Sequence, residues 1–178
     1  HRDKLTDGEE GYAALFQGEI YNNQGMSDRA YQQFERATQL LDDRFKRAEA
    51  WMRMAEYQAG IGAFQEATAL ADKSAGEIPD QGWKMLLVAN FFMQHGLYEK
   101  AEEYYRRYAM MNAPDDPLAF HRIMADAYKE ANQRDRFIRA ASEYIEAATA
   151  DGRVPSEAES GLIAYYQGEI HFLRGEVE

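Results

Sequence analysis

The chain has 178 residues, a length that suits one ordinary domain with a sizeable hydrophobic core. Its formal net charge of −11 disfavours nucleic-acid binding, because phosphate recognition needs clustered lysine and arginine side chains. The sequence contains no cysteine, which excludes disulfides, thiol catalysis and thiolate metal sites, and no apolar run approaches the ~20 residues that span a membrane. We expect a soluble protein without direct membrane insertion, and its composition fits the cytoplasm and the bacterial periplasm equally well.

The residue types favour an all-α fold. Alanine, glutamate, glutamine, arginine, methionine and leucine are abundant and form helices readily, whereas β-branched residues are scarce. Helix-start and helix-stop signals divide the chain into nine segments, with ends defined to about ±2–4 residues. The predicted helices are residues 9–24, 28–41, 44–60, 63–75, 81–95, 98–112, 117–131, 133–150 and 157–174.

Three helix starts depend on particular capping residues. Thr6 with Glu9, and Ser156 with Glu159, have the spacing of a capping box, in which each side chain bonds the backbone of the other residue. Ser27 is predicted to cap the second helix, because a hydroxyl at that position accepts a hydrogen bond from the first turn.

The chain repeats itself at intervals of 34 to 37 residues. Gly25, Gly62, Gly96 and Asn132 are separated by 37, 34 and 36 residues, and each can adopt the left-handed backbone that ends a helix. We expect Gly62 to occupy a tight turn between two helices. Mostly small side chains recur at fixed distances around these markers: Gly18, Ala55, Ala89 and Ala125 seven residues before them, and Ala30, Ala67, Ala101 and Phe137 five residues after them. Small side chains on facing helices let two backbones approach closely, so the pattern predicts helical hairpins.

The repeated pattern resembles the tetratricopeptide repeat, whose consensus runs W-x2-L-G-x2-Y, then Gly, then A-x3-F-x2-A and a closing Pro. Matching residues include Gly18, Tyr21, Gly25, Ala30, Phe34 and Ala37 in the first repeat, and Trp51, Ala55, Gly62, Ala67, Ala71 and Pro79 in the second. The resemblance implies a right-handed α-solenoid of antiparallel helix pairs that forms one domain over residues 1–178. Its repeats would be about 9–42, 44–79, 81–114 and 117–152, with a partial fifth at 157–178. We expect this domain to belong to a longer chain.

In the tetratricopeptide family the first helix of each pair lines a concave groove that holds an extended peptide or a helix. Leu86, Leu87 and Phe16 fit such a groove and fit packing between repeats equally well. The groove residues that the resemblance implies here are Tyr12, Leu15, Glu19, Asn22, Met52, Arg53, Glu56, Trp83, Leu86, Asn90, Arg122 and Asp126.

The chemistry of these positions indicates the kind of partner. Some members of the family hold the C-terminal carboxylate of chaperones with lysine and asparagine, but here those positions carry Leu15, Glu19, Arg53, Trp83 and Leu87. Arg53 alone does not form such a clamp. A groove of methionine, leucine and aromatic side chains dotted with carboxylates suits an amphipathic helix or a basic-hydrophobic segment of another protein.

No pattern in the sequence indicates catalysis, a cofactor or a metal. His121 and His171 have no partner at ligand spacing, and we expect both imidazoles to be packed against neighbouring helices. His95 is predicted to cap the end of its helix. The segment Gly60-Ile61-Gly62 lacks the third glycine and the preceding strand of a dinucleotide-binding loop. We therefore expect a protein that is not an enzyme.

Two functions remain open from the sequence. The first is a protein-interaction scaffold, which the resemblance connects with larger assemblies such as those of the bacterial envelope that export polysaccharide or build pili. The alternative is a structural element that associates with itself through an apolar terminal helix. The apolar residues of that helix are Leu162, Ile163, Tyr165, Tyr166, Ile170, Phe172 and Leu173.

Overall fold

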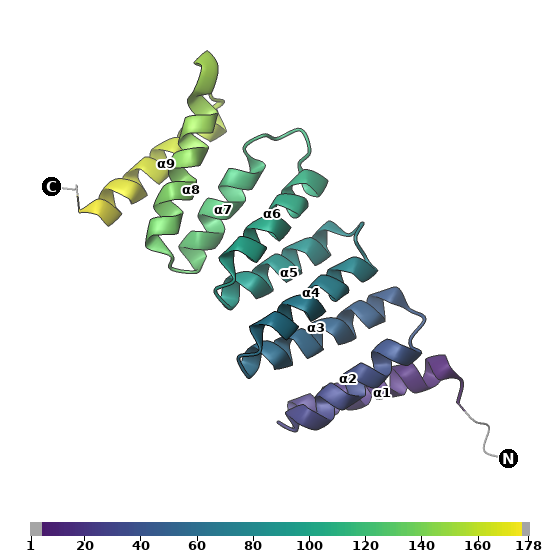
Figure 1. Cartoon of the computed structure of the whole chain (residues 1–178). Helices are drawn as coiled ribbons and strands as arrows, with labels where there is room; N and C mark the ends of the chain where they lie inside the picture. Colours follow the sequence, from purple (N-terminus) through teal and green to yellow (C-terminus); the bar gives the residue numbers. More distant parts are fainter. Residues whose placement is uncertain (1–4, 176–178) are drawn as a thin grey trace. The chain divides into compact units, whose positions relative to one another are not determined.

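The computed structural model describes residues 5–175, apart from the side chain of Asp151, and its regular secondary structure is entirely helical (Figure 1). A short 3-10 turn, Ala150–Gly152, follows the eighth α-helix. The α-helices are α1 (Asp7–Asn23), α2 (Ser27–Leu40), α3 (Arg44–Gly60), α4 (Phe64–Glu77), α5 (Gly82–Gln94), α6 (Tyr98–Asn112), α7 (Ala119–Glu130), α8 (Arg134–Thr149) and α9 (Glu157–Arg174).

The all-α prediction and the positions of the nine predicted helices are confirmed, with every end within two residues of its expected place. The start of α7 differs because residues 117–118 form a turn ahead of the helix. In that turn Asp116 Oδ1 accepts a hydrogen bond of 2.9 Å from the backbone N–H of Leu118. Asp116 therefore stabilises the turn that precedes α7, and the helix itself begins at Ala119.

Both predicted capping boxes are present, but Ser27 does not cap α2. Thr6 and Ser156 each accept a bond from the third helical residue, whose glutamate reaches back to the cap. Met26 occupies the capping position of α2 and makes no side-chain capping bond to the backbone of the helix, and Ser27 is already the first helical residue. The reason is the preceding turn, in which the Met26 N–H donates a hydrogen bond of 2.8 Å to Tyr21 O. Because this turn ends at Met26, the capping position falls on Met26, one residue before Ser27.

The four repeat markers all have the left-handed backbone that was predicted. Their φ angles are +72° at Gly25, +82° at Gly62, +72° at Gly96 and +55° at Asn132. At Gly62 the turn closes with two backbone bonds, from Gly62 N–H to Ala59 O and from Ala63 N–H to Gln58 O. This pair of bonds is the Schellman arrangement that ends a helix and reverses the chain within a few residues.

Replacing Gly62 by valine should therefore destabilise the chain by more than ~1 kcal/mol, because a β-branched residue is strained at positive φ. A Cβ at this glycine would meet no atom within 4 Å, so the expected loss comes from the backbone alone. Urea denaturation of the variant measures it. An unchanged unfolding midpoint would contradict the prediction.

The described helices form two compact units, α1–α5 and α6–α9. In the first unit α1 packs with α2 and α3 with α4, while α2 contacts α3 and α4 contacts α5. In the second unit α7 packs with α8, while α6 contacts α7 and α8 contacts α9. The packing of consecutive helices in pairs is consistent with a helical repeat. The third predicted pair, α5 and α6, is divided between the two units.

Small residues lie where paired helices come closest. Ala55 on α3 and Ala67 on α4 are fully buried. Gly18 of α1 lies so close to the ring of Phe34 on α2 that an added Cβ would be 2.5 Å from Cε1 of that ring. These contacts explain why the sequence repeats a small residue at this position.

Candidate partner-binding hollow between α3 and α5

A hollow of about 860 Å³ lies in the first unit, between side chains of α3 and α5. Both are first helices of predicted pairs, and six of the residues predicted to form the groove line it: Met52, Arg53, Glu56, Trp83, Leu86 and Asn90. Phe45, Lys46, Glu49, Lys84, Leu87, Phe91, Gln94 and His95 complete the lining. Residues that the sequence analysis expected in one groove thus lie around one hollow, although they come from two helices that are separated by α4.

The predicted residues of α1 lie outside this hollow and have other contacts. Tyr12 donates a hydrogen bond of 2.9 Å to Asp43 Oδ2, ahead of α3, and this bond lowers the pKa of Asp43. Glu19 accepts from Arg53, as described below, and Asn22 lines a smaller hollow of about 330 Å³ between α1, α2 and α3. Leu15 is only 2% exposed, so the structure places this side chain in the hydrophobic core, where a partner does not reach it.

Arg122 and Asp126 belong to α7 in the second unit, and both have partners there. Arg122 forms an ion pair of 3.2 Å with Asp116, and Asp126 accepts a hydrogen bond of 3.0 Å from the Tyr166 hydroxyl. Burial of Tyr166 raises the pKa of that hydroxyl, and the neighbouring Asp126 raises it further. Asp126 thus links α7 to α9, whereas Arg122 links α7 to the turn ahead of it.

The walls of the hollow are apolar and open to solvent. Trp83, the second residue of α5, is 52% exposed, and Phe45 and Leu87 are exposed as well. Met52 is buried below them. Leu87 and Phe16, for which the sequence left two readings open, are both exposed, whereas Leu86 is half-buried. Large exposed apolar side chains gathered around one hollow are typical of a binding surface.

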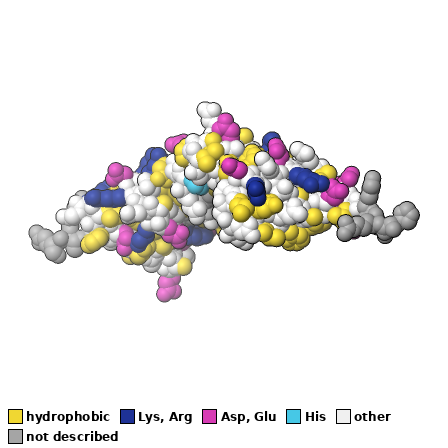
Figure 2. All heavy atoms as spheres, turned by 90° about the horizontal axis from the view of Figure 1, so that it is seen from below, with side chains coloured by type: hydrophobic (Ala, Val, Ile, Leu, Met, Phe, Trp, Pro, Cys, Tyr) yellow, Lys and Arg dark blue, Asp and Glu magenta, His cyan; other side chains and the backbone are white. Residues whose placement is uncertain are grey.

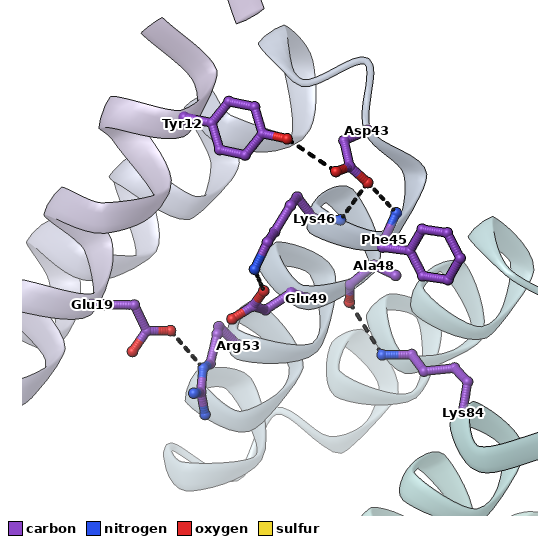
Figure 3. A network of polar contacts seen from close by, with 9 residues as sticks. All are labelled: Tyr12, Glu19, Asp43, Phe45, Lys46, Ala48, Glu49, Arg53 and Lys84. Atoms are coloured by element: carbon purple, nitrogen blue, oxygen red, sulfur yellow. Dashed lines mark hydrogen bonds and ion pairs between the residues drawn. The ribbon is translucent and has the colours of Figure 1, made fainter. Parts of the chain in front are cut away.

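Each carboxylate on this wall of α3 is paired with a cation of the same chain. Lys46 Nζ lies 2.8 Å from Glu49 Oε2 (Figure 3). Arg53 bridges two helices, because its Nε lies 2.8 Å from Glu19 Oε1 on α1 (Figure 3). Its Nη1 lies 3.0 Å from Glu56 Oε2 on its own helix. The lining thus carries three cations, Lys46, Arg53 and Lys84, against two carboxylates. The hollow is therefore not a negatively charged one.

Lys84 is one of the lining residues that the sequence analysis did not name for the groove. Its side chain is 3% exposed, and among the described residues its Nζ donates one hydrogen bond, of 3.3 Å, to the backbone oxygen of Ala48 (Figure 3). Burial lowers the pKa of Lys84 to about 8, although the charges of Glu49 and Glu56 act in the opposite direction. One signal could have revealed it: a lysine in the first turn of an apolar helix, where the helix dipole disfavours a cation.

The apolar face of α9 is smaller than its sequence suggests. Ile170 and Tyr166 are buried, so neither is available for association. Tyr165 is exposed but accepts a hydrogen bond from Lys129, whereas Phe172 is 71% exposed. Leu173 is half-buried. Self-association through α9 stays a prediction that now depends on the side chains outside the core: Leu162, Ile163, Tyr165, Phe172 and Leu173.

The histidines occupy three different settings. His95 is the capping residue at the end of α5, as predicted, and its ring lies 4.8 Å from that of Phe91. His121 is half-buried beside Phe120, with Nδ1 3.7 Å from Glu143 Oε2. His171 is exposed, contrary to the packed position expected for it.

No protein-family model matches the chain, and no curated protein is similar to it in sequence. Among the described helices, none has the length and apolar character needed to cross a bilayer. Within the same residues, no group of three or more histidine or acidic side chains is arranged to hold a metal ion.

Proposed function

We propose that this chain is a non-enzymatic scaffold of the tetratricopeptide-repeat type, and that the hollow between α3 and α5 binds an amphipathic helix of another protein. The observation that carries the proposal is the half-exposed Trp83 beside Phe45 and Leu87 at a hollow of about 860 Å³. Solvent-exposed tryptophan is costly in a surface without a partner, and aromatic side chains dominate the binding energy of many interfaces.

The helical repeat supports the family assignment. Schellman turns with a left-handed residue recur at Gly25, Gly62 and Asn132, and the helices on either side of each turn pack together. We propose that these pairs continue as a right-handed solenoid, with the first helices of the pairs on the binding side. From the same resemblance, we propose a role in assembling a larger complex, such as one of the bacterial envelope.

The charges that line the hollow favour one of the two partners expected from the sequence, the amphipathic helix, over the other, the basic-hydrophobic segment. A basic-hydrophobic segment would need free carboxylates, but Glu49 and Glu56 are each within 3.0 Å of a cation of this chain. The face of the molecule shown in Figure 2 carries acidic and basic side chains interspersed, without a large patch of either kind. An amphipathic helix whose apolar side chains enter the hollow fits these charges better, because apolar contact does not depend on unpaired carboxylates.

Selection of peptides tests this proposal. A phage-displayed library of random 15-residue peptides is panned on the purified chain, and the enriched peptides are titrated by fluorescence anisotropy. We expect enriched sequences with apolar residues at helical spacing (i, i+3 or i+4, i+7). Trp83→Ala should weaken their binding about 30-fold, which corresponds to about 2 kcal/mol, with little change in the melting temperature.

Phe16→Ala is the matched control. Phe16 is also an exposed aromatic side chain, but it lies on α1 outside the hollow, so its removal should change binding less than about twofold. Equal losses in both variants would contradict the proposal. A Trp83→Ala protein that melts early, but binds normally while folded, would place Trp83 in the core and contradict it as well.

A further inference from the structure

We infer that the segment bound in the hollow brings a carboxylate to Lys84, so that the partner is an amphipathic helix with an aspartate or glutamate within its apolar face. This inference rests on the proposed function, since it names the chemistry of the partner at the same site. The inferred partner carries an acidic residue at the site, whereas one of the partners expected from the sequence was a basic segment.

The first argument is the incomplete bonding of Lys84. A lysine ammonium has three N–H donors, and here one of them has an acceptor, Ala48 O at 3.3 Å. The acceptor is a neutral backbone oxygen at the long end of the normal range. Among the described residues, no ion pair includes Lys84, although its side chain is 3% exposed. A cation that is buried in this way is costly unless a counter-charge is supplied.

The second argument is that the nearby carboxylates are already committed. Glu49 is held by Lys46 and Glu56 by Arg53, so both act on Lys84 only from a distance. Arg53 is in turn fixed by Glu19 of α1. Moving Glu49 to Lys84 would leave Lys46 without its ion pair, and moving Glu56 would break its 3.0 Å pair with Arg53, although Arg53 would keep Glu19. A carboxylate from a bound partner would supply the counter-charge without breaking either pair.

The third argument is the position of Lys84 in its own helix. It is the third residue of α5, where the positive end of the helix dipole disfavours a cation. Methionine or leucine would fill the same space without either cost. Residues that break several local rules at once are expected at functional sites, where binding compensates for the lost stability.

The neighbourhood of Lys84 defines the form of the partner. Lys84 lies in the lining directly after Trp83, and Figure 3 shows its side chain reaching from α5 towards Ala48 of α3. A carboxylate that reaches the ammonium must enter the hollow beside the exposed aromatic side chains. The acid therefore has to sit among apolar residues of the partner helix. A pair formed in such a shielded place contributes more to specificity than to affinity, because both charges lose water.

A double-mutant cycle between chain and peptide tests the inference. The probes are the peptides enriched on the wild-type chain, each made with its acidic residue and with the matching amide, Glu→Gln or Asp→Asn. The chains are wild type, Lys84→Met and the control Lys46→Met, in which an exposed lysine of the same hollow is removed. We expect the amide to weaken binding at least about tenfold on wild type and on Lys46→Met, but less than about twofold on Lys84→Met.

Three results would overturn the inference, and they separate it from the proposed function. Enriched peptides that need Trp83 but contain no acidic residue would refute it and leave the proposed function standing. The inference is also refuted if the amide peptide still binds more weakly than the acidic one on Lys84→Met, or if this difference disappears on Lys46→Met instead. Either result would mean that a cation other than Lys84 binds the peptide's carboxylate. If no enriched peptide depends on Trp83, both the proposed function and the inference fail.

Discussion

Lys84→Met is expected to stabilise the unliganded chain by about 2–3 kcal/mol at pH 7. The pKa of Lys84 falls from 10.5 to about 8 on folding, and each unit of such a change corresponds to about 1.4 kcal/mol. Replacement of a buried charge by a hydrophobic residue of similar volume commonly stabilises by about 1–4 kcal/mol. The size of the effect reflects the 3% exposure of this side chain.

The advantage of methionine should disappear as the pH rises. Below pH 8 the lysine is protonated in both the folded and the unfolded chain, so folding carries the full cost of a buried cation. Between about pH 8 and 10.5 the unfolded chain binds more protons than the folded one, so the stability of wild type rises with pH relative to the variant. Above about pH 10.5 Lys84 is neutral in both the folded and the unfolded chain, so folding no longer buries a charge there.

Tryptophan fluorescence during urea denaturation at pH 7 and pH 10 measures this difference. The two tryptophans of the chain are Trp51 on α3 and Trp83 on α5, so the signal reports the unit that contains Lys84. Lys46→Met is the control, because Lys46 is half-exposed and its pKa is raised by Glu49; its loss should cost at most about 1 kcal/mol. If the two substitutions changed the free energy of unfolding equally, the burial of the Lys84 charge would not be the cause, and the prediction would be wrong.

Gly18→Ala and Gly168→Ala should change stability in opposite directions. The two glycines occupy the same tetrapeptide, Gln-Gly-Glu-Ile, once in α1 and once in α9. At Gly18 an added Cβ would lie 2.5 Å from Cε1 of the buried Phe34, so we expect a net loss of about 1–2 kcal/mol. At Gly168 the Cβ would meet nothing within 4 Å, and alanine should stabilise by about 0.5–1 kcal/mol through helix propensity.

Denaturation of the two variants beside wild type tests the pair, with tryptophan fluorescence for Gly18→Ala and circular dichroism for Gly168→Ala. Stabilisation by both alanines would show that Phe34 moves aside without cost. Loss of stability in both would show that α9 has a covered face at Gly168. The first outcome contradicts the close packing of Gly18 against Phe34, and the second contradicts the open space at Gly168 of α9.

The helices and turns were predictable because their causes are local. Thr6 and Ser156 cap helices through residues three positions away, and Gly25 and Gly62 end helices through their own backbone conformation. Such signals lie within a few residues of the feature that they determine. Ser27 shows the limit of this reasoning: it has the chemistry of a cap, but the turn at Gly25 placed the capping position one residue earlier.

The candidate hollow was predictable only in part. Met52, Glu56 and Trp83 were expected on one side from helical spacing and from the resemblance, and they do line one hollow. The ion pair between Arg53 and Glu19 was not foreseen, because it joins residues 34 positions apart whose separation depends on how α1 packs beside α3. Burial of Lys84 escaped prediction for the same reason, since Ala48 on another helix supplies its acceptor.

The sequence by itself determined where each helix begins and ends, since capping, helix propensity and left-handed turns act over a few residues. Only the tertiary structure decided which side chains are exposed, because exposure depends on what other helices cover. Ile20 and Ile170 end the same tetrapeptide, yet Ile20 is 54% exposed and Ile170 is 6% exposed. Around Ile170 the preceding helix α8 packs on α9. Identical local sequence thus gives a core residue in one place and a surface residue in the other.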